Sequence, residues 1–196
     1  MDGILVINKD KNCTSHDVVY KIKKIFNEAR VIRMDADTTR RKNAHQELIS
    51  EFSSGKYNIL VGTQMISKGL NFEKVSLVGV INPDSSLSIP DFRSGEKTYE
   101  LLSQTAGRVG RFNIPGKVII QTYNPNNYVY QNILKNDFEA YYNDEMDIRK
   151  KLKYPPFYYI CNVTIISNEF NKCSSEANKI KKYLDNNLSD KYIILG

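Results

Sequence analysis

Asn58-Ile-Leu-Val61 and Val75-Ser-Leu-Val-Gly-Val-Ile81 decide the fold, because both are short segments that are apolar almost throughout. Such segments predict strands that are buried on both faces. Similar segments recur along the chain, and stretches with a helical spacing of apolar residues lie between them, which predicts an α/β fold with a mostly parallel sheet. The predicted strands are 3–7, 30–34, 58–61, 75–81 and 117–122, and the helices between them are about 15–26, 44–53 and 95–105.

The region after residue 125 has a different pattern. Residues 126–153 look helical and are rich in aromatic and charged side chains, and Tyr154-Pro-Pro-Phe157 stops that helical pattern. Beyond it, a strand at 158–166, an amphipathic helix at 169–188 and a strand at 192–195 predict an α+β domain. Since these elements need more sheet than the sequence supplies, we expect this C-terminal domain to be incomplete. The chain is therefore divided into 1–28, 29–150 and a truncated domain at 151–196.

Composition excludes several classes of protein. Of the 196 residues, 41% are hydrophobic and 26% charged, which is typical of globular proteins, and no apolar run approaches the ~20 residues of a membrane span. We therefore expect a cytoplasmic protein that does not enter a membrane. The three cysteines have no metal-binding spacing, so neither a disulfide framework nor a metal site is predicted. The net charge of +6 weakly favours an anionic partner such as nucleic acid.

Gln104-Thr-Ala-Gly-Arg-Val-Gly-Arg111 is the most specific motif. Its two arginines are three residues apart, so both guanidinium groups fall on one side of a helical turn. Forked, permanently charged donors suit the negative charge of a phosphoryl group in transfer. A lone arginine pair would more often bind surface carboxylates. However, this pattern resembles motif VI of superfamily 2 helicases, which favours Arg108 and Arg111 as catalytic residues and Gln104 and Gly107 as nucleotide-binding residues.

A second motif, Gly62-Thr-Gln-Met-Ile-Ser-Lys-Gly69, follows a predicted buried strand. Backbone amides and hydroxyls at such a position can meet a phosphate. Alone, the segment could be an ordinary strand-to-helix turn, but it stands some forty residues before motif VI and resembles helicase motif V. That resemblance implies that Thr63, Gln64 and Lys68 contact DNA and that Gly69 lies beside the nucleotide.

The order of these segments resembles one family, the primosomal protein N′ helicases, also called PriA. The resemblance covers about residues 29–196, with Asn82-Pro-Asp84 where Asn-Ala-Asp is expected. It implies a second RecA-like motor lobe of the P-loop NTPase type, 3′-to-5′ DNA unwinding driven by ATP and Mg²⁺, and a role in replication restart. The implied partners are forked or single-stranded DNA, primosome proteins and single-strand-binding protein. The other segments that carry the resemblance are 33–39, Asp91-Phe-Arg-Ser-Gly-Glu96, 121–125 and 154–157.

Two features of a complete motor do not occur in the sequence. Gly116-Lys117-Val118 lacks the spacing and the final hydroxyl of a P-loop. Asp144-Glu145 follows no apolar strand, so it is predicted to be part of an exposed helical face with i,i+4 pairing rather than a Walker B pair. The paired cysteines of the family's zinc module also do not occur. We therefore expect the chain alone to be inactive, because ATP and Mg²⁺ would be held mainly by another lobe.

The first residues resemble a different family. Met1-Asp-Gly-Ile-Leu-Val-Ile-Asn-Lys9, followed by Thr14-Ser-His-Asp-Val-Val19, resembles the opening of a TruB-type tRNA pseudouridine synthase, but the catalytic aspartate motif of that family does not occur. Residues 1–28 are interpreted as a foreign leader in which Asp2, His16 and Asp17 have surface or capping roles. Two alternatives to the helicase hypothesis remain, a non-catalytic primosome-interaction module and a remnant of a pseudouridine synthase fusion.

Overall fold

The computed structural model describes residues 3–7, 14–41, 43–63, 75–107, 109, 116–189 and 191–194. The chain separates into two compact units, Met1–Lys153 and Tyr154–Gly196.

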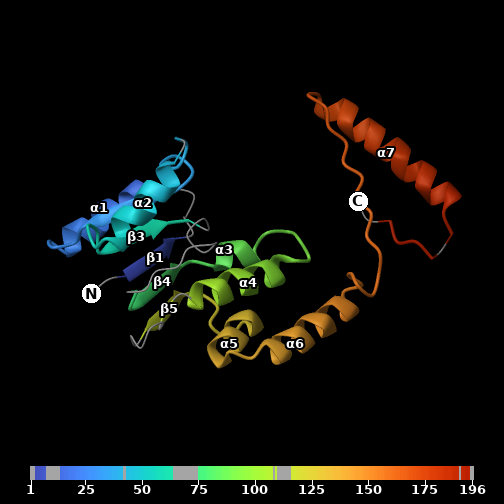
Figure 1. Cartoon of the computed structure of the whole chain (residues 1–196). Coiled ribbons are helices and arrows are strands. Elements are labelled where there is room, and N and C mark those ends of the chain that lie inside the picture. The colour runs from blue at the N-terminus through green and yellow to red at the C-terminus, as the bar shows by residue number, and fades with distance from the viewer. Residues whose placement is uncertain are drawn as a thin grey trace. The chain divides into compact units, whose positions relative to one another are not determined.

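The first unit is built on one parallel sheet of five strands. These are β1 (Gly3–Ile7), β2 (Val31–Met34), β3 (Ile59–Gly62), β4 (Leu77–Ile81) and β5 (Lys117–Gln121), in the order β2-β3-β1-β4-β5 (Figure 1). Strand β1 is central, with Leu5 opposite both Val61 of β3 and Gly79 of β4. The stretch interpreted as a leader thus supplies the middle strand of the sheet.

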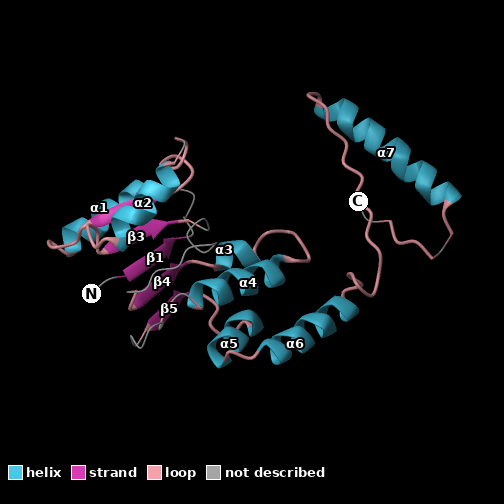
Figure 2. Cartoon of the chain, in the orientation of Figure 1, coloured by secondary structure: helices cyan, strands magenta, loops and turns pink. Residues whose placement is uncertain are grey.

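Helices cover both faces of the sheet, as the apolar strands require (Figure 2). On one face, Val31 and Val61 pack against Val18, Val19 and Ile22 of α1 (Ser15–Ile25). On the other face, Met34, Leu60 and Val78 form the main core with side chains of α2 (Ala44–Ser53) and α4 (Ser94–Ala106). A short helix, α3 (Asp84–Leu87), follows β4 and was not predicted.

Helix α1 begins with a capping box. The backbone amide of Asp17 donates to Oγ1 of Thr14 at 3.2 Å, and the amide of Thr14 donates to Oδ2 of Asp17 at 2.7 Å. These reciprocal bonds satisfy two amides that a helix start leaves without a partner. The hydroxyl of Thr14, which donates to Oδ2 of Asp17 at 2.6 Å, and the amide of Thr14 lower the pKa of the Asp17 carboxyl. The predicted capping role of Asp17 is confirmed.

The helical region after β5 consists of two helices, α5 (Tyr128–Lys135) and α6 (Phe138–Lys151). Asn136 ends α5 in the left-handed region with φ 52°, and Asp137 caps α6 by accepting from the amide of Ala140 at 2.9 Å. Asparagine tolerates this conformation better than most residues. The sequence pattern shows helical residues on both sides of the turn, so it did not locate the break.

The second unit contains α7 (Phe170–Asn187), and its described residues form no strand. The predicted strand at 158–166 is therefore wrong, and the described part of the one at 192–195 is also not a strand. A strand needs a neighbour to pair its N–H and C=O groups, and the described part of this unit offers none. Large apolar side chains such as Tyr159 and Ile166 are consequently exposed. The α+β expectation for this unit is corrected to a single described helix.

Candidate nucleotide and nucleic-acid site

The carboxyl edge of the sheet is the candidate site. All strand pairs are parallel, so the residues that follow the five strands meet at one edge. Open sheets of this kind bind ligands outside the carboxyl ends of their strands. Thr63 directly follows β3 and is half-buried, so it lies at this edge. The edge also carries Asp35 after β2, Asp84 after β4 and Thr122 after β5.

Asp84 is occupied by hydrogen bonds from within the chain. Its carboxylate accepts from Oγ1 of Thr122 at 2.7 Å, from the amide of Tyr123 at 2.9 Å and from the hydroxyl of Tyr130 at 2.8 Å. Partial burial opposes the charged form, but these three donors outweigh it and lower the pKa of Asp84. A carboxylate that is held ionised in this way connects segments of the fold and is a poor general acid.

Asp35 begins a turn that is held by hydrogen bonds to Thr38 and Thr39. Its carboxylate forms an ion pair with Nε of Arg33 at 3.2 Å and accepts from the amide of Thr38 at 3.1 Å. The hydroxyls of Thr38 and Thr39 donate to the carbonyl oxygen of Asp35. Burial opposes ionisation, but the Thr38 and Arg33 contacts outweigh it, and the pKa of Asp35 is lowered. These contacts give the segment 33–39 a structural role at the edge of the sheet.

Helix α4 carries Gln104 and Gly107 at its C-terminal end. Nε2 of Gln104 donates to Oε1 of Glu100 at 2.8 Å, one turn earlier. Gly107 caps the helix, and its amide donates to the carbonyl oxygen of Ser103 at 2.9 Å. Since φ at Gly107 is −66°, the backbone conformation alone does not require glycine. The five other site residues fall outside the described residues, and their assignments stay predictions: Gln64, Lys68, Gly69, Arg108 and Arg111.

A cavity of about 550 Å³ lies between α4, β5 and α5. Val118 and Ile120 of β5, Ile133 of α5 and Gly107 are among the residues that line it. Among the described residues that line the cavity none carries a charge, so it does not suit the phosphates of a nucleotide. The carboxyl edge remains the better candidate for phosphate binding.

Of the acidic pair on α6, Asp144 is exposed as predicted, but Glu145 is buried. Glu145 is only 4% exposed and forms an ion pair with Arg149 at 2.8 Å, so the predicted i,i+4 pairing is confirmed and the predicted exposure of Glu145 is wrong. The hydroxyl of Tyr128 also donates to Glu145, while Asp144 accepts from Nδ2 of Asn132 at 2.8 Å. Both carboxylates are thus engaged by protein groups. The sequence pattern missed the burial because surface pairs have the same spacing.

The described part of the chain contains no cluster of three or more His, Cys, Asp or Glu side chains that could hold a metal ion. Cys161 and Cys173 are free thiols. No described helix is both long enough and apolar enough to cross a membrane.

A protein-family model and several related proteins match the chain. The model of the helicase conserved C-terminal domain matches residues 3–113. The replication restart protein PriA of Bacillus subtilis is 50% identical over 176 residues, which cover 90% of this chain and 22% of the relative. PriA of Borreliella burgdorferi is 41% identical over 186 residues, which cover 88% of this chain and 28% of the relative. The chain thus spans about a fifth to just over a quarter of the length of these relatives.

Among solved structures, the C-terminal domain of the DEAD-box protein Dbp5 is 22% identical, with a TM-score of 0.47, and the match covers 76% of this chain and 82% of that one. The comparisons give no support to the resemblance of the first residues to a pseudouridine synthase, and the family match begins at residue 3. The predicted RecA-like α/β fold and the resemblance to the primosomal replication-restart helicases are both confirmed. The chain belongs to the family of the helicase conserved C-terminal domain.

Proposed function

We propose that the chain acts as the second motor lobe of an ATP-dependent 3′-to-5′ DNA helicase of replication restart. The observation that carries this proposal is the family match over residues 3–113, which includes both helicase motifs. The fold supports it, because Thr63 lies at the carboxyl edge of a parallel sheet, and α4 ends at Ala106 with Gly107 of motif VI as its cap.

The two motif VI arginines would act on the γ-phosphoryl group. Arg108 and Arg111 carry permanent charge and forked donors, which stabilise the charge that develops when a phosphoryl group is transferred. Gln104 and Gly107, at the end of α4, would lie beside the nucleotide together with Gly69. Thr63, Gln64 and Lys68 would contact the DNA backbone.

ATP and Mg²⁺ would be bound mainly by another lobe. The sequence contains no P-loop, and the described carboxylates at the sheet edge, Asp35 and Asp84, are already engaged by protein donors. Zinc has no ligand cluster in the described part of the chain. Forked or single-stranded DNA, primosome proteins and single-strand-binding protein are the proposed partners, in the cytoplasm.

The test is to join the chain to an ATP-binding first lobe from a related replication-restart helicase, here called the joined protein. We expect DNA-stimulated ATP hydrolysis from the joined protein and none from the chain alone. The matched control replaces Arg108 and Arg111 with alanine. If the joined protein folds and binds ATP but hydrolyses it no faster than this control, the proposal is wrong.

A further inference from the structure

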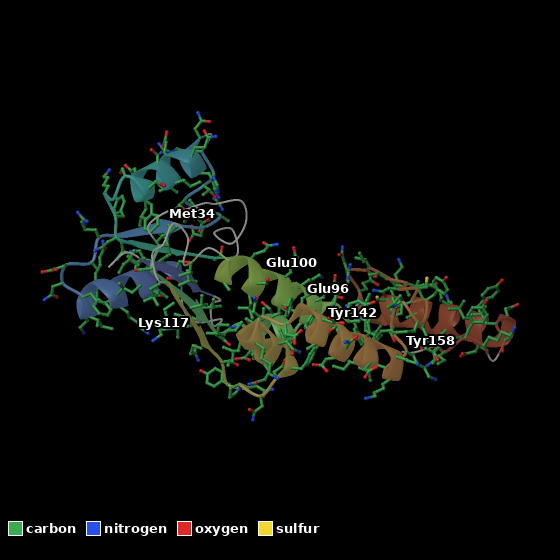
Figure 3. All side chains as sticks on the ribbon, turned by 60° about the horizontal axis from the view of Figure 1, so that its bottom comes forward. Met34, Glu96, Glu100, Lys117, Tyr142 and Tyr158 are labelled. Atoms are coloured by element: carbon green, nitrogen blue, oxygen red, sulfur yellow. The ribbon has the colours of Figure 1, made fainter. Side chains whose placement is uncertain are left out.

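Arg149 joins two helices that are far apart in the sequence. Its Nε donates to Oε1 of Glu145 on the same helix at 2.8 Å, and its Nη2 donates to Oε2 of Glu96 on α4 at 2.7 Å. The guanidinium carbon also lies 5.2 Å from the centroid of the Phe92 ring. The Arg149 side chain is 9% exposed and the Glu145 side chain 5%. The arginine is therefore buried between α4 and α6, and Figure 3 shows Glu96 and Glu100 in successive turns of α4.

These contacts give a role to the segment Asp91–Glu96, which has no assigned function in the helicase mechanism proposed above. Phe92 and Glu96 receive the guanidinium group of Arg149. Gly95 leaves room for the side chains of Tyr128 and Glu145, because a Cβ there would lie 2.5 Å from the hydroxyl oxygen of Tyr128 and 2.9 Å from Oε2 of Glu145. The segment Asp91–Glu96 thus packs against side chains of α6.

The position of this contact along each helix matters. Glu96 lies in the first turn of α4, and the same helix ends at Ala106, directly before Gly107 and the motif VI arginines. Arg149 lies in the last turn of α6, which ends at Lys151, three residues before the second unit begins. The contact thus connects the start of the motif VI helix to the segment that leads into the second unit.

We propose that Arg149 is a positioning residue that fixes α4 along its axis and couples the motif VI end of α4 to the C-terminal end of α6. The rings of Tyr99 on α4 and Tyr141 on α6 stack at a centroid distance of 3.8 Å, but stacked rings can slide past one another. The hydrogen bond from Arg149 to Glu96 crosses to α4, and the bond to Glu145 within α6 orients the guanidinium group for it. Both bonds are charge-assisted and directional, so the Glu96 bond is made at one position of α4. The effect on ATP hydrolysis rests on the proposed function, whereas the coupling between the helices does not.

Hydrogen–deuterium exchange of the purified chain tests the coupling. In Arg149→Met, the loss of stability accelerates exchange throughout the first unit, and we expect the amides of α4 from Thr98 to Gly107 to accelerate at least roughly tenfold more than those of β3 and β4. Lys150→Met, at an exposed neighbouring position on α6, should change neither region. Arg149→Lys should restore little, because an ammonium group cannot reproduce the planar fork.

The outcomes separate coupling from simple stabilisation. Faster exchange in α6 alone, or an equal acceleration in every strand and helix, would overturn the proposal. Should Arg149→Met fail to fold, Glu96→Gln keeps the Glu145–Arg149 pair and must still accelerate exchange selectively in α4, by up to about fivefold because the Glu96 side chain is 55% exposed. In the joined protein, Arg149→Met should lower kcat while KM for ATP stays within about twofold. An unchanged kcat would contradict the positioning role. A wild-type joined protein that hydrolyses no ATP would instead contradict the proposed function. In that case hydrogen–deuterium exchange would still decide whether Arg149 couples the two helices.

Discussion

Replacing Arg149 with methionine should strongly destabilise the first unit. Methionine keeps much of the side-chain volume but removes the cation, so the Glu145 carboxylate, 5% exposed, would be left buried with its positive partner removed. Breaking a buried pair in this way costs about 3–5 kcal/mol. We expect the lower end of that range, because the hydroxyl of Tyr128 still donates to Glu145. By contrast, the Glu96 side chain is 55% exposed, so Glu96→Gln should cost no more than about 1 kcal/mol.

Urea unfolding followed by circular dichroism measures this difference. The control is Arg40→Met, since Arg40 pairs with Asp37 on the surface with side-chain exposures of 78% and 69%, and its loss should change stability by less than about 0.5 kcal/mol. An Arg149→Met variant that unfolds at the urea concentration of the Arg40→Met control would refute the reasoning. It would mean that the buried ion pair contributes no more than a surface pair.

Three further predictions follow from the described contacts and the charge. Gly95→Ala should lower the stability of the first unit by about 1–3 kcal/mol, because the new Cβ would lie 2.5 Å from the hydroxyl oxygen of Tyr128. Adding Tyr128→Phe removes that oxygen and should recover part of the loss. Equal unfolding midpoints for the single and double variants would contradict this prediction. Because the pKa of Asp84 is lowered in the folded state, its contribution to stability is complete above the unfolded value of 3.8 and is lost as the pH falls through the folded value, so acid unfolding should be less steep in Asp84→Asn. If Asp84→Asn loses stability with falling pH as steeply as the wild type does, a group other than Asp84 causes the acid sensitivity. With a net charge of +6, the chain alone should bind DNA weakly and lose affinity as salt rises, and fluorescence anisotropy showing submicromolar affinity at high salt would be inconsistent with this expectation.

The strands and most helices were predictable from the sequence because their signals are local. Apolar runs such as 75–81 give β4, and the apolar spacing after Thr14 gives α1 together with its capping box. The turn at Asn136 was missed because helical patterns lie on both sides of it. The strand at 158–166 was wrongly predicted because periodicity indicates a tendency to form a strand and cannot supply the neighbour that pairs with it.

The candidate site was only partly predictable for the same reason. The resemblance to helicase motifs V and VI pointed to Thr63, Gln104 and Gly107, and the fold places the first at the carboxyl edge and the others at the end of α4. The buried pair of Glu145 and Arg149 looked like a surface pair, because its second carboxylate, that of Glu96, lies 53 residues away in the sequence. Burial of a charged residue depends on such distant partners, and a local pattern does not contain them.

The turnover of the joined protein tests the role of Arg111 most directly. An arginine that meets the γ-phosphoryl charge mainly in the transition state contributes to kcat far more than to ATP binding. Arg111→Ala should therefore leave ATP affinity within a few-fold and lower kcat by roughly 10²–10⁴, and Arg111→Lys should recover little of it. Near-normal turnover in the alanine variant, with a loss of stability alone, would show that Arg111 is a structural residue and would contradict the motif VI assignment.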